Sequence, residues 1–131
     1  MISRILITIC VSIFAVVIPV LEVNASHVFN SSWPAHARFH EVWQLITNCG
    51  IGLLCIWLVW LKNKVQLASI LVVLVMGGVL AAYAIQGFYS GSLLSGNTSK
   101  TILGMELAAF AASFAVAMAI GAAILESRSK K

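Results

Sequence analysis

Four long apolar runs constrain this chain more than any other feature of its sequence. They cover residues 5–21, 42–61, 65–89 and 101–125. A helix needs roughly 20 apolar residues to cross a hydrocarbon core of about 30 Å, and in lipid its backbone groups must bond within the segment. The runs therefore predict four transmembrane helices near residues 4–21, 34–61, 65–89 and 101–125, with loops at 22–33 and 90–100.

The composition excludes an ordinary soluble fold. Of the 131 residues, 61% are hydrophobic and 9% are charged, which is far from the balance of globular domains. A chain of this length forms one domain, here residues 1–131. We therefore expect an all-α polytopic membrane protein, an antiparallel four-helix transmembrane bundle whose main partner is the lipid bilayer.

The basic residues gather on one side of the predicted membrane, which explains the net charge of +4 without a nucleic-acid partner. On that side lie Arg4, Lys62, Lys64, Arg128, Lys130 and Lys131. The loops on the other side hold only Arg38 and Lys100. Cytoplasmic loops carry the excess of Lys and Arg. Both termini are therefore predicted to be cytoplasmic, in a bacterial inner membrane or a plasma membrane, with the histidine-containing loop extracytoplasmic.

The first run also has the pattern of a secretory signal peptide. Arg4, an apolar core and a small-residue stretch before Ser26 match the usual order of such signals. Cleavage there would leave three helices. Pro19 and Glu22, however, suit a helix that ends at the outer interface, so we expect the first helix to be retained.

The start of the second helix carries two of the three histidines. Ser32 is predicted to cap this helix, Trp33 to anchor it at the interface, and Pro34 to occupy its first turn. At 100° per residue, His36 and His40 share one side of the helix, which is extended by Trp43, Gln44, Thr47 and Asn48. This polar side is expected to face protein or water.

Glu106 is the only formal charge inside any of the four runs. A carboxylate within a span costs roughly 2.5–3.5 kcal/mol on insertion scales, so it is usually turned inward and paired. We expect its partner to be His36 or His40. These three residues, with Gln44, Gln86 and Trp33, form the predicted outer-leaflet site, which binds a lipophilic small molecule or a metal ion, or handles a proton. In the structural alternative, the same side chains bond only neighbouring loop and helix groups.

A transition metal is one version of this site. Histidines at i and i+4 can both bind one ion, and His27 or Glu106 would then complete three ligands. The H-x-x-x-H spacing lacks the internal Glu of the zinc-protease motif, so it does not by itself indicate a metal site. Haem is not expected, because His36 and His40 lie on one helix face and cannot ligate opposite sides of a porphyrin.

Small residues in the third and fourth runs indicate close helix packing. Gly77 and Gly78 are predicted to permit a close approach or a slight kink. The fourth run repeats small residues at four-residue spacing, at 108/112, 111/115, 115/119 and 117/121. This pattern favours a packing helix and a dock for a larger membrane complex or a second copy. The free thiols of Cys10, Cys49 and Cys55 are expected to pack without reacting.

The string N-x-x-W-P-x-H-A-R-F-H, followed by a tryptophan, resembles the signature of small four-helix integral membrane proteins of unknown function. It is carried by Asn30, Trp33, Pro34, His36, Ala37, Arg38, Phe39, His40 and Trp43. The resemblance implies that these residues act as a unit, and it implies no substrate.

Three classes of function remain: a binding or proton-handling protein, an accessory subunit of a larger membrane complex, and a small membrane enzyme using His and Glu for acid–base or metal chemistry.

Overall fold

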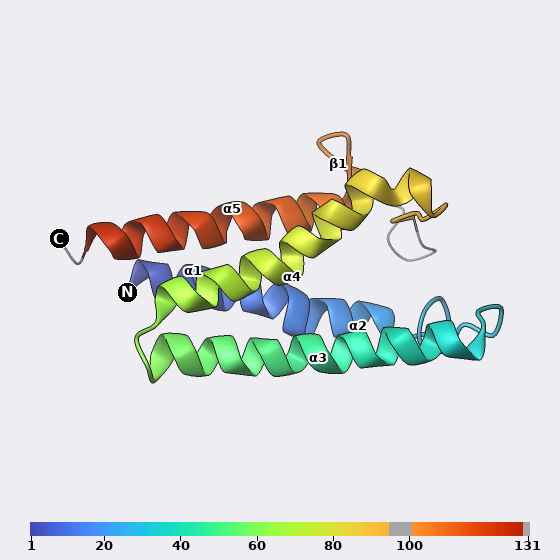
Figure 1. The fold of residues 1–131 in the computed structure, drawn as a ribbon, viewed down its shortest axis with the longest axis horizontal. Coiled ribbons are helices and arrows are strands. Elements are labelled where there is room, and N and C mark those ends of the chain that lie inside the picture. The colour runs from blue at the N-terminus through green and yellow to red at the C-terminus, as the bar shows by residue number, and fades with distance from the viewer. Residues whose placement is uncertain (95–100, 130–131) are drawn as a thin grey trace.

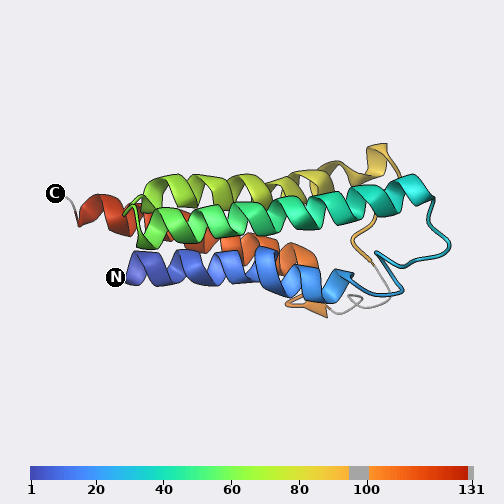
Figure 2. The ribbon, with the colours of Figure 1, turned by 90° about the horizontal axis from the view of Figure 1, so that it is seen from below.

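The computed structural model describes residues 1–94 and 101–129. Within these ranges four helical segments form a bundle in which successive segments run antiparallel (Figures 1 and 2), and each is long and apolar enough to cross a membrane. The predicted all-helical architecture is thus confirmed. The segments are α1 (Ile2–Ser12) with the π-helix η1 (Ile13–Val17) and α2 (Ile18–Glu22), then α3 (Ala35–Trp60), α4 (Val65–Ile85) with the 3-10 turn η2 (Gln86–Phe88), and α5 (Leu107–Arg128).

The two ends of the bundle differ in chemistry. The start of α1, the end of α5 and the turn between α3 and α4 lie together at one end (Figure 1), here called the basic end, with Arg4, Lys62, Lys64 and Arg128. The opposite end, here called the histidine end, holds the 23–34 loop with His27 and the start of α3 with His36 and His40. Lys100, Lys130 and Lys131 lie outside the described residues.

The start of α3 differs in detail from the prediction. Pro34 itself is the N-cap, and its carbonyl accepts the first backbone hydrogen bonds of the helix, from Ala37 and Arg38. Ser32 does not cap α3, because its hydroxyl donates to the Oδ1 of Asn30 at 2.6 Å. Asn30 also donates to the carbonyl of Ser26 at 2.9 Å, so the loop is folded onto itself just before the helix begins.

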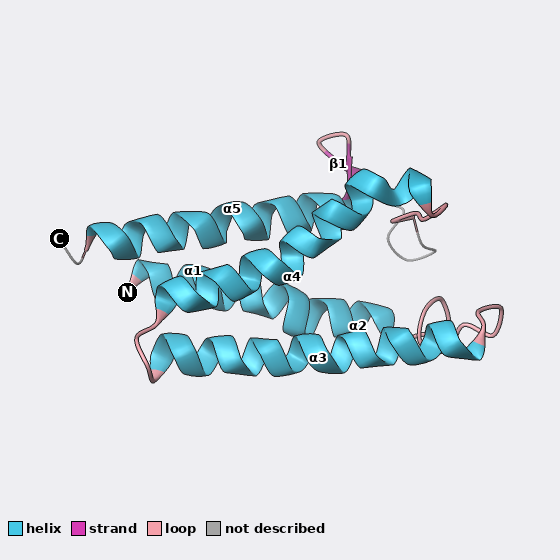
Figure 3. Ribbon diagram, in the orientation of Figure 1, coloured by secondary structure: helices cyan, strands magenta, loops and turns pink. Residues whose placement is uncertain are grey.

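The fourth span begins at Leu107 rather than at residue 101 as predicted. Residues 101–106 form a small hairpin of β1 (Thr101–Ile102) and β2 (Met105–Glu106), coloured magenta in Figure 3. The two residues between the strands, Leu103 and Gly104, both have positive φ, at 52° and 77°. Such a turn closes a two-residue hairpin and cannot continue a helix. Glu106 is consequently the N-cap of α5 and lies outside its helical turns.

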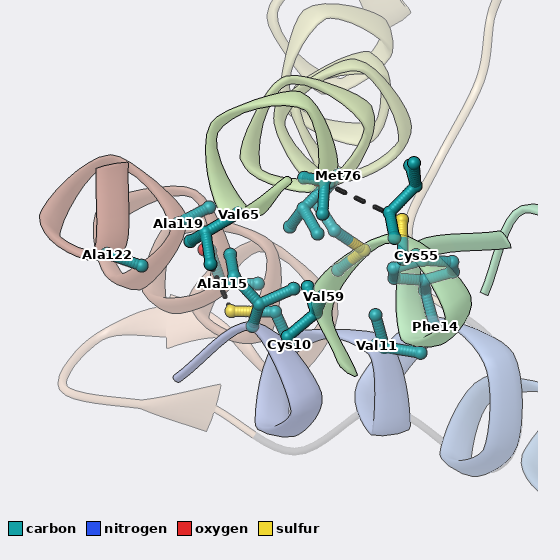
Figure 4. Close-up of a cluster of buried hydrophobic side chains, with 14 of the residues drawn as sticks. Cys10, Val11, Phe14, Cys55, Val59, Val65, Met76, Ala115, Ala119 and Ala122 are labelled. Carbon is teal, nitrogen blue, oxygen red and sulfur yellow. Dashed lines mark hydrogen bonds between the residues drawn. The ribbon is translucent and has the colours of Figure 1, made fainter. Parts of the chain in front are cut away.

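Small side chains of α5 form one wall of the bundle core. Its buried residues are Ala109, Ala112, Ala115, Ala119 and Ala122. They pack toward larger side chains of the other helices, among them Phe14, Val59 and Met76 (Figure 4). The thiol of Cys10 donates to the carbonyl of Ala115 at 3.4 Å. The predicted role of this helix in close packing is confirmed within the chain itself, since α5 lies against both α1 and α4.

Only a small share of the residues in each helix is buried in the interior of the bundle. Between 22 and 28% of the most apolar window of each span is buried inside the bundle. Large apolar side chains such as Leu53, Ile70 and Leu74 point outward and are more than half exposed. An outer surface of this kind suits a hydrocarbon solvent and would be costly in water.

At the π-helical turn η1, a glycine of α3 packs closely against the first helix. Pro19 has no N–H to bond the carbonyl of Ala15, four residues earlier, and a wider turn relieves the clash between the proline ring and that carbonyl. The thiol of Cys49 donates to this carbonyl at 3.4 Å. One helical turn later, a Cβ added to Gly52 would lie 2.4 Å from the Cβ of Ala15. Only glycine at position 52 permits this contact.

Gly77 and Gly78 make no such contact, so the predicted close approach at these residues is wrong. A Cβ at Gly78 would meet no described atom within 4 Å, and one at Gly77 would meet only Val73 of the same helix. Gly78 instead opens onto a cleft.

Candidate functional site

A cleft of about 460 Å³ lies at the histidine end, between α3 and α4. Figure 1 shows α4 leaving α3 toward this end and approaching the start of α5. Phe14 of η1 and Ile18 of α2 also line the cleft. Its apolar walls are completed by Val75, Met76, Gly78, Val79, Ala82 and Leu93.

Polar side chains enter the cleft from both of the helices that border it. Gln44 and Asn48 come from α3, Tyr83 from α4, and Gln86 from η2, with Ser92 and Tyr89 from the loop that follows. The hydroxyl of Tyr89 donates to the carbonyl of Ala82 at 3.0 Å, which folds this loop back over the end of α4. The described residues that line the cleft include no charged side chain.

The polar side of α3 connects the cleft to the histidines. His36, His40, Gln44 and Asn48 follow one another at four-residue spacing and form a stripe along one side of the helix, as predicted. A second hollow of about 300 Å³ lies on this stripe, lined by His40, Trp43, Gln44, Thr47 and Asn48. Gln44 and Asn48 line both hollows, so the stripe leads from the exposed start of α3 into the cleft.

The structure brings His36 and His40 together at the start of this stripe. Their Nε2 atoms are 2.9 Å apart, and the rings are nearly perpendicular with centroids 4.4 Å apart. Both side chains are exposed. Neither makes a hydrogen bond or ion pair with Glu106 among the described residues. The buried Oε2 of Glu106 has no hydrogen-bond partner in this part of the chain.

A histidine–carboxylate pair that was not predicted joins the 23–34 loop to the last residue of α2. His27 Nε2 lies 2.8 Å from Glu22 Oε2, and both side chains are mostly buried, at 11% and 19% exposed. The other ring nitrogen of His27 is 2.8 Å from the hydroxyl of Ser26. Trp33 packs edge-on against the same ring, with centroids 5.6 Å apart. The Asn24 turn, in which the Ser26 N–H donates to Asn24 Oδ1 at 2.7 Å, was the available signal that Glu22 and His27 meet.

This pairing changes the metal hypothesis. Both ring nitrogens of His27 are engaged with Glu22 and Ser26. Within residues 1–94 and 101–129, no three His, Cys, Asp or Glu side chains are grouped so as to hold a metal ion. Neither of the predicted third ligands, His27 or Glu106, is therefore grouped with His36 and His40. Trp33 was a predicted residue of the outer-leaflet site. It contacts His27 and is not among the residues that line the cleft.

Gln44 and Gln86 are the two predicted site residues that line the cleft. Asn48, Tyr83 and Ser92 line it as well and were not predicted as site residues, because their role depends on how far α3 and α4 diverge.

Comparison with known proteins adds no relative: no family model matches the chain, and no curated protein or solved structure matches it significantly.

Proposed function

We propose that this chain is an integral membrane binding protein for a neutral lipophilic small molecule that carries a hydrogen-bonding group. The observation that supports this proposal is the cleft of about 460 Å³, whose apolar walls hold amide side chains on two facing elements. Small-molecule sites are typically apolar hollows of about 300–1,000 Å³ with a few convergent polar groups.

The chemistry of the lining favours a neutral ligand. Gln44, Asn48 and Gln86 each offer one carbonyl acceptor and an NH₂ donor, so they match a hydroxyl, carbonyl or amide group equally well. A charged group would enter a low-dielectric site with no opposite charge among the described lining residues, which is costly. The apolar walls match a hydrocarbon body, at about 25 cal/mol for each Å² removed from water.

The positive-inside rule orients this site in the membrane. The described basic residues cluster at the end opposite the cleft, so the proposed topology has the basic end in the cytoplasm and the cleft at the outer leaflet. A lipophilic ligand would then reach the cleft from the bilayer or along the stripe that carries His36 and His40.

Native mass spectrometry of the purified chain tests the proposal. We expect the wild-type chain, ejected from a mild uncharged detergent, to carry one co-purified adduct of defined mass. Replacing two cleft amides, in the variant Gln44→Leu with Gln86→Leu, removes polar contacts worth about 0.5–1.5 kcal/mol each. The affinity should fall about tenfold, which the spectra report as a smaller bound fraction.

The matched control is Gln66→Leu, because Gln66 lies at the basic end and bonds Ser127 at 2.8 Å. It should leave the adduct in place. Equal adduct in all three proteins would contradict the proposed site. A chain without any adduct that co-purifies with one larger membrane protein would overturn the proposal in favour of an accessory subunit.

A further inference from the structure

The pair of His36 and His40 lies outside the cleft proper and is not explained by small-molecule binding. The two Nε2 atoms face each other at 2.9 Å on an exposed face of α3. A histidine pair bonded in this way contributes little to the fold, because both rings are open to solvent and neither bonds any other described side chain. A role in folding therefore does not explain why the two imidazoles lie side by side, and a role in binding does.

The spacing of the two nitrogens matches that of adjacent ligands on one metal ion. Two imidazole bonds of about 2.05 Å at a right angle place the nitrogens about 2.9 Å apart. One regular helix carries both histidines, so the second bond forms within the molecule and gains from a high effective concentration. His40 is also flanked by Trp43 and Phe39, with ring centroids 5.5 and 6.1 Å away, which restricts the orientation of its ring.

We propose that His36 and His40 form a two-histidine chelating site for one divalent late first-row transition ion, with Cu²⁺ bound more tightly than Ni²⁺ or Zn²⁺. Imidazole nitrogens suit these ions, and affinity for a given nitrogen site peaks at Cu²⁺. Because both rings are exposed, water completes the coordination sphere, and His27 takes no part since Glu22 holds it. The site is independent of the ligand in the cleft.

Titration of the tag-free, full-length chain with CuCl₂ in uncharged detergent tests this proposal. Isothermal calorimetry and the Cu²⁺ paramagnetic resonance spectrum report stoichiometry and nitrogen ligation. We expect one Cu²⁺ per chain at the pair, with quenching of the fluorescence of Trp43, which lies 5.5 Å from His40. His36→Ala and His40→Ala should each weaken this binding about tenfold or more, through loss of the chelate.

The matched control keeps the number of histidines and breaks their spacing. In His40→Ala with Val42→His, the second imidazole moves to another exposed position, six residues from His36 and on a different side of α3. It should bind as weakly as His40→Ala alone. Binding of Cu²⁺ that is equally tight in the wild type and this variant, or that survives His36→Ala, would overturn the proposal. Each substitution is at an exposed position, and circular dichroism before titration verifies that the helices are intact.

Discussion

The two ends of the bundle are held together in different ways. At the basic end, side-chain hydrogen bonds join helices that are distant in sequence: Ser3 to Glu126, Arg4 to Asn63, Trp60 to Thr8 and Gln66 to Ser127. At the histidine end, the described side-chain bonds join near neighbours in the sequence, such as Ser26 with His27, Asn30 with Ser32 and His36 with His40. Among the described residues, side-chain hydrogen bonds therefore cross-link distant helices at the basic end and not at the histidine end.

This difference explains how a small bundle can contain a cleft. Anchoring the helices at one end fixes their order, so α3 and α4 can separate at the other end without loss of the fold. Binding sites are commonly drawn from the less constrained parts of a structure. The contact of Gly52 with Ala15 lies between the two ends and holds α3 against the first helix below the cleft.

The largest effect on stability is expected at Gly52. In Gly52→Val the new Cβ would lie 2.4 Å from the Cβ of Ala15, so the two backbones must separate, at a cost of about 3 kcal/mol in the free energy of unfolding. Thermal melting in detergent, followed by circular dichroism, measures this loss. Gly50→Val is the matched control, because a Cβ at Gly50 meets no described atom within 4 Å. Equal melting temperatures for the two variants would show that this contact does not hold the helices.

A smaller loss is expected when the ion pair of the histidine end is broken. His27→Ala leaves the mostly buried carboxylate of Glu22 without its partner and should cost about 2 kcal/mol. Glu22→Leu combined with His27→Phe removes both polar side chains, and its cost should be less than the sum of the single changes. The rate of limited proteolysis in the 23–34 loop should rank the single and double variants in the same order as their losses of stability. Strictly additive losses would mean that the two side chains do not interact.

At the basic end, Ser3→Ala removes the hydroxyl that donates to Glu126 at 2.9 Å and should cost about 1 kcal/mol. The control is Ser12→Ala, whose exposed hydroxyl bonds only the Thr8 carbonyl of its own helix. Urea-assisted thermal melting of the two variants compares them directly. If Ser3→Ala were as stable as Ser12→Ala, side-chain cross-links would not be what distinguishes this end.

The smallest change in stability is expected at Gly78. Leucine at this position fits into the cleft, since a Cβ there meets no described atom within 4 Å, and glycine is a poor helix former. Gly78→Leu should therefore change the free energy of unfolding by less than about 0.5 kcal/mol. A loss as large as that of Gly52→Val in the same thermal melts would mean that the histidine end is packed as tightly as the α1 and α3 contact.

The sequence predicts the spans well because long apolar runs have few alternatives in a membrane. The stripe of His36, His40 and Gln44 was equally predictable, since it depends only on helical periodicity. Which glycine touches a neighbour was not, because Gly52 and Gly78 differ only in what lies opposite them.

Two other features of the structure were not predicted, because they too depend on how separate segments fold against one another. The start of α5 depends on a turn in which Leu103 has a positive φ, which is unusual for leucine and not indicated by its sequence. The pairing of Glu22 with His27 depends on how the loop folds back on itself. Local patterns therefore predicted the helices, while contacts between segments decided which side chains line the cleft.

Two glycine variants decide whether the histidine end contains a ligand-binding cleft. The measurement is the fraction of chains that carry the co-purified adduct in native mass spectra. Gly78→Leu fills the cleft, whereas Gly50→Leu adds the same side chain to an open position on α3 that does not line it. We expect the bound fraction to fall about tenfold or more in Gly78→Leu and to stay unchanged in Gly50→Leu. Equal bound fractions in the two folded variants would contradict this expectation.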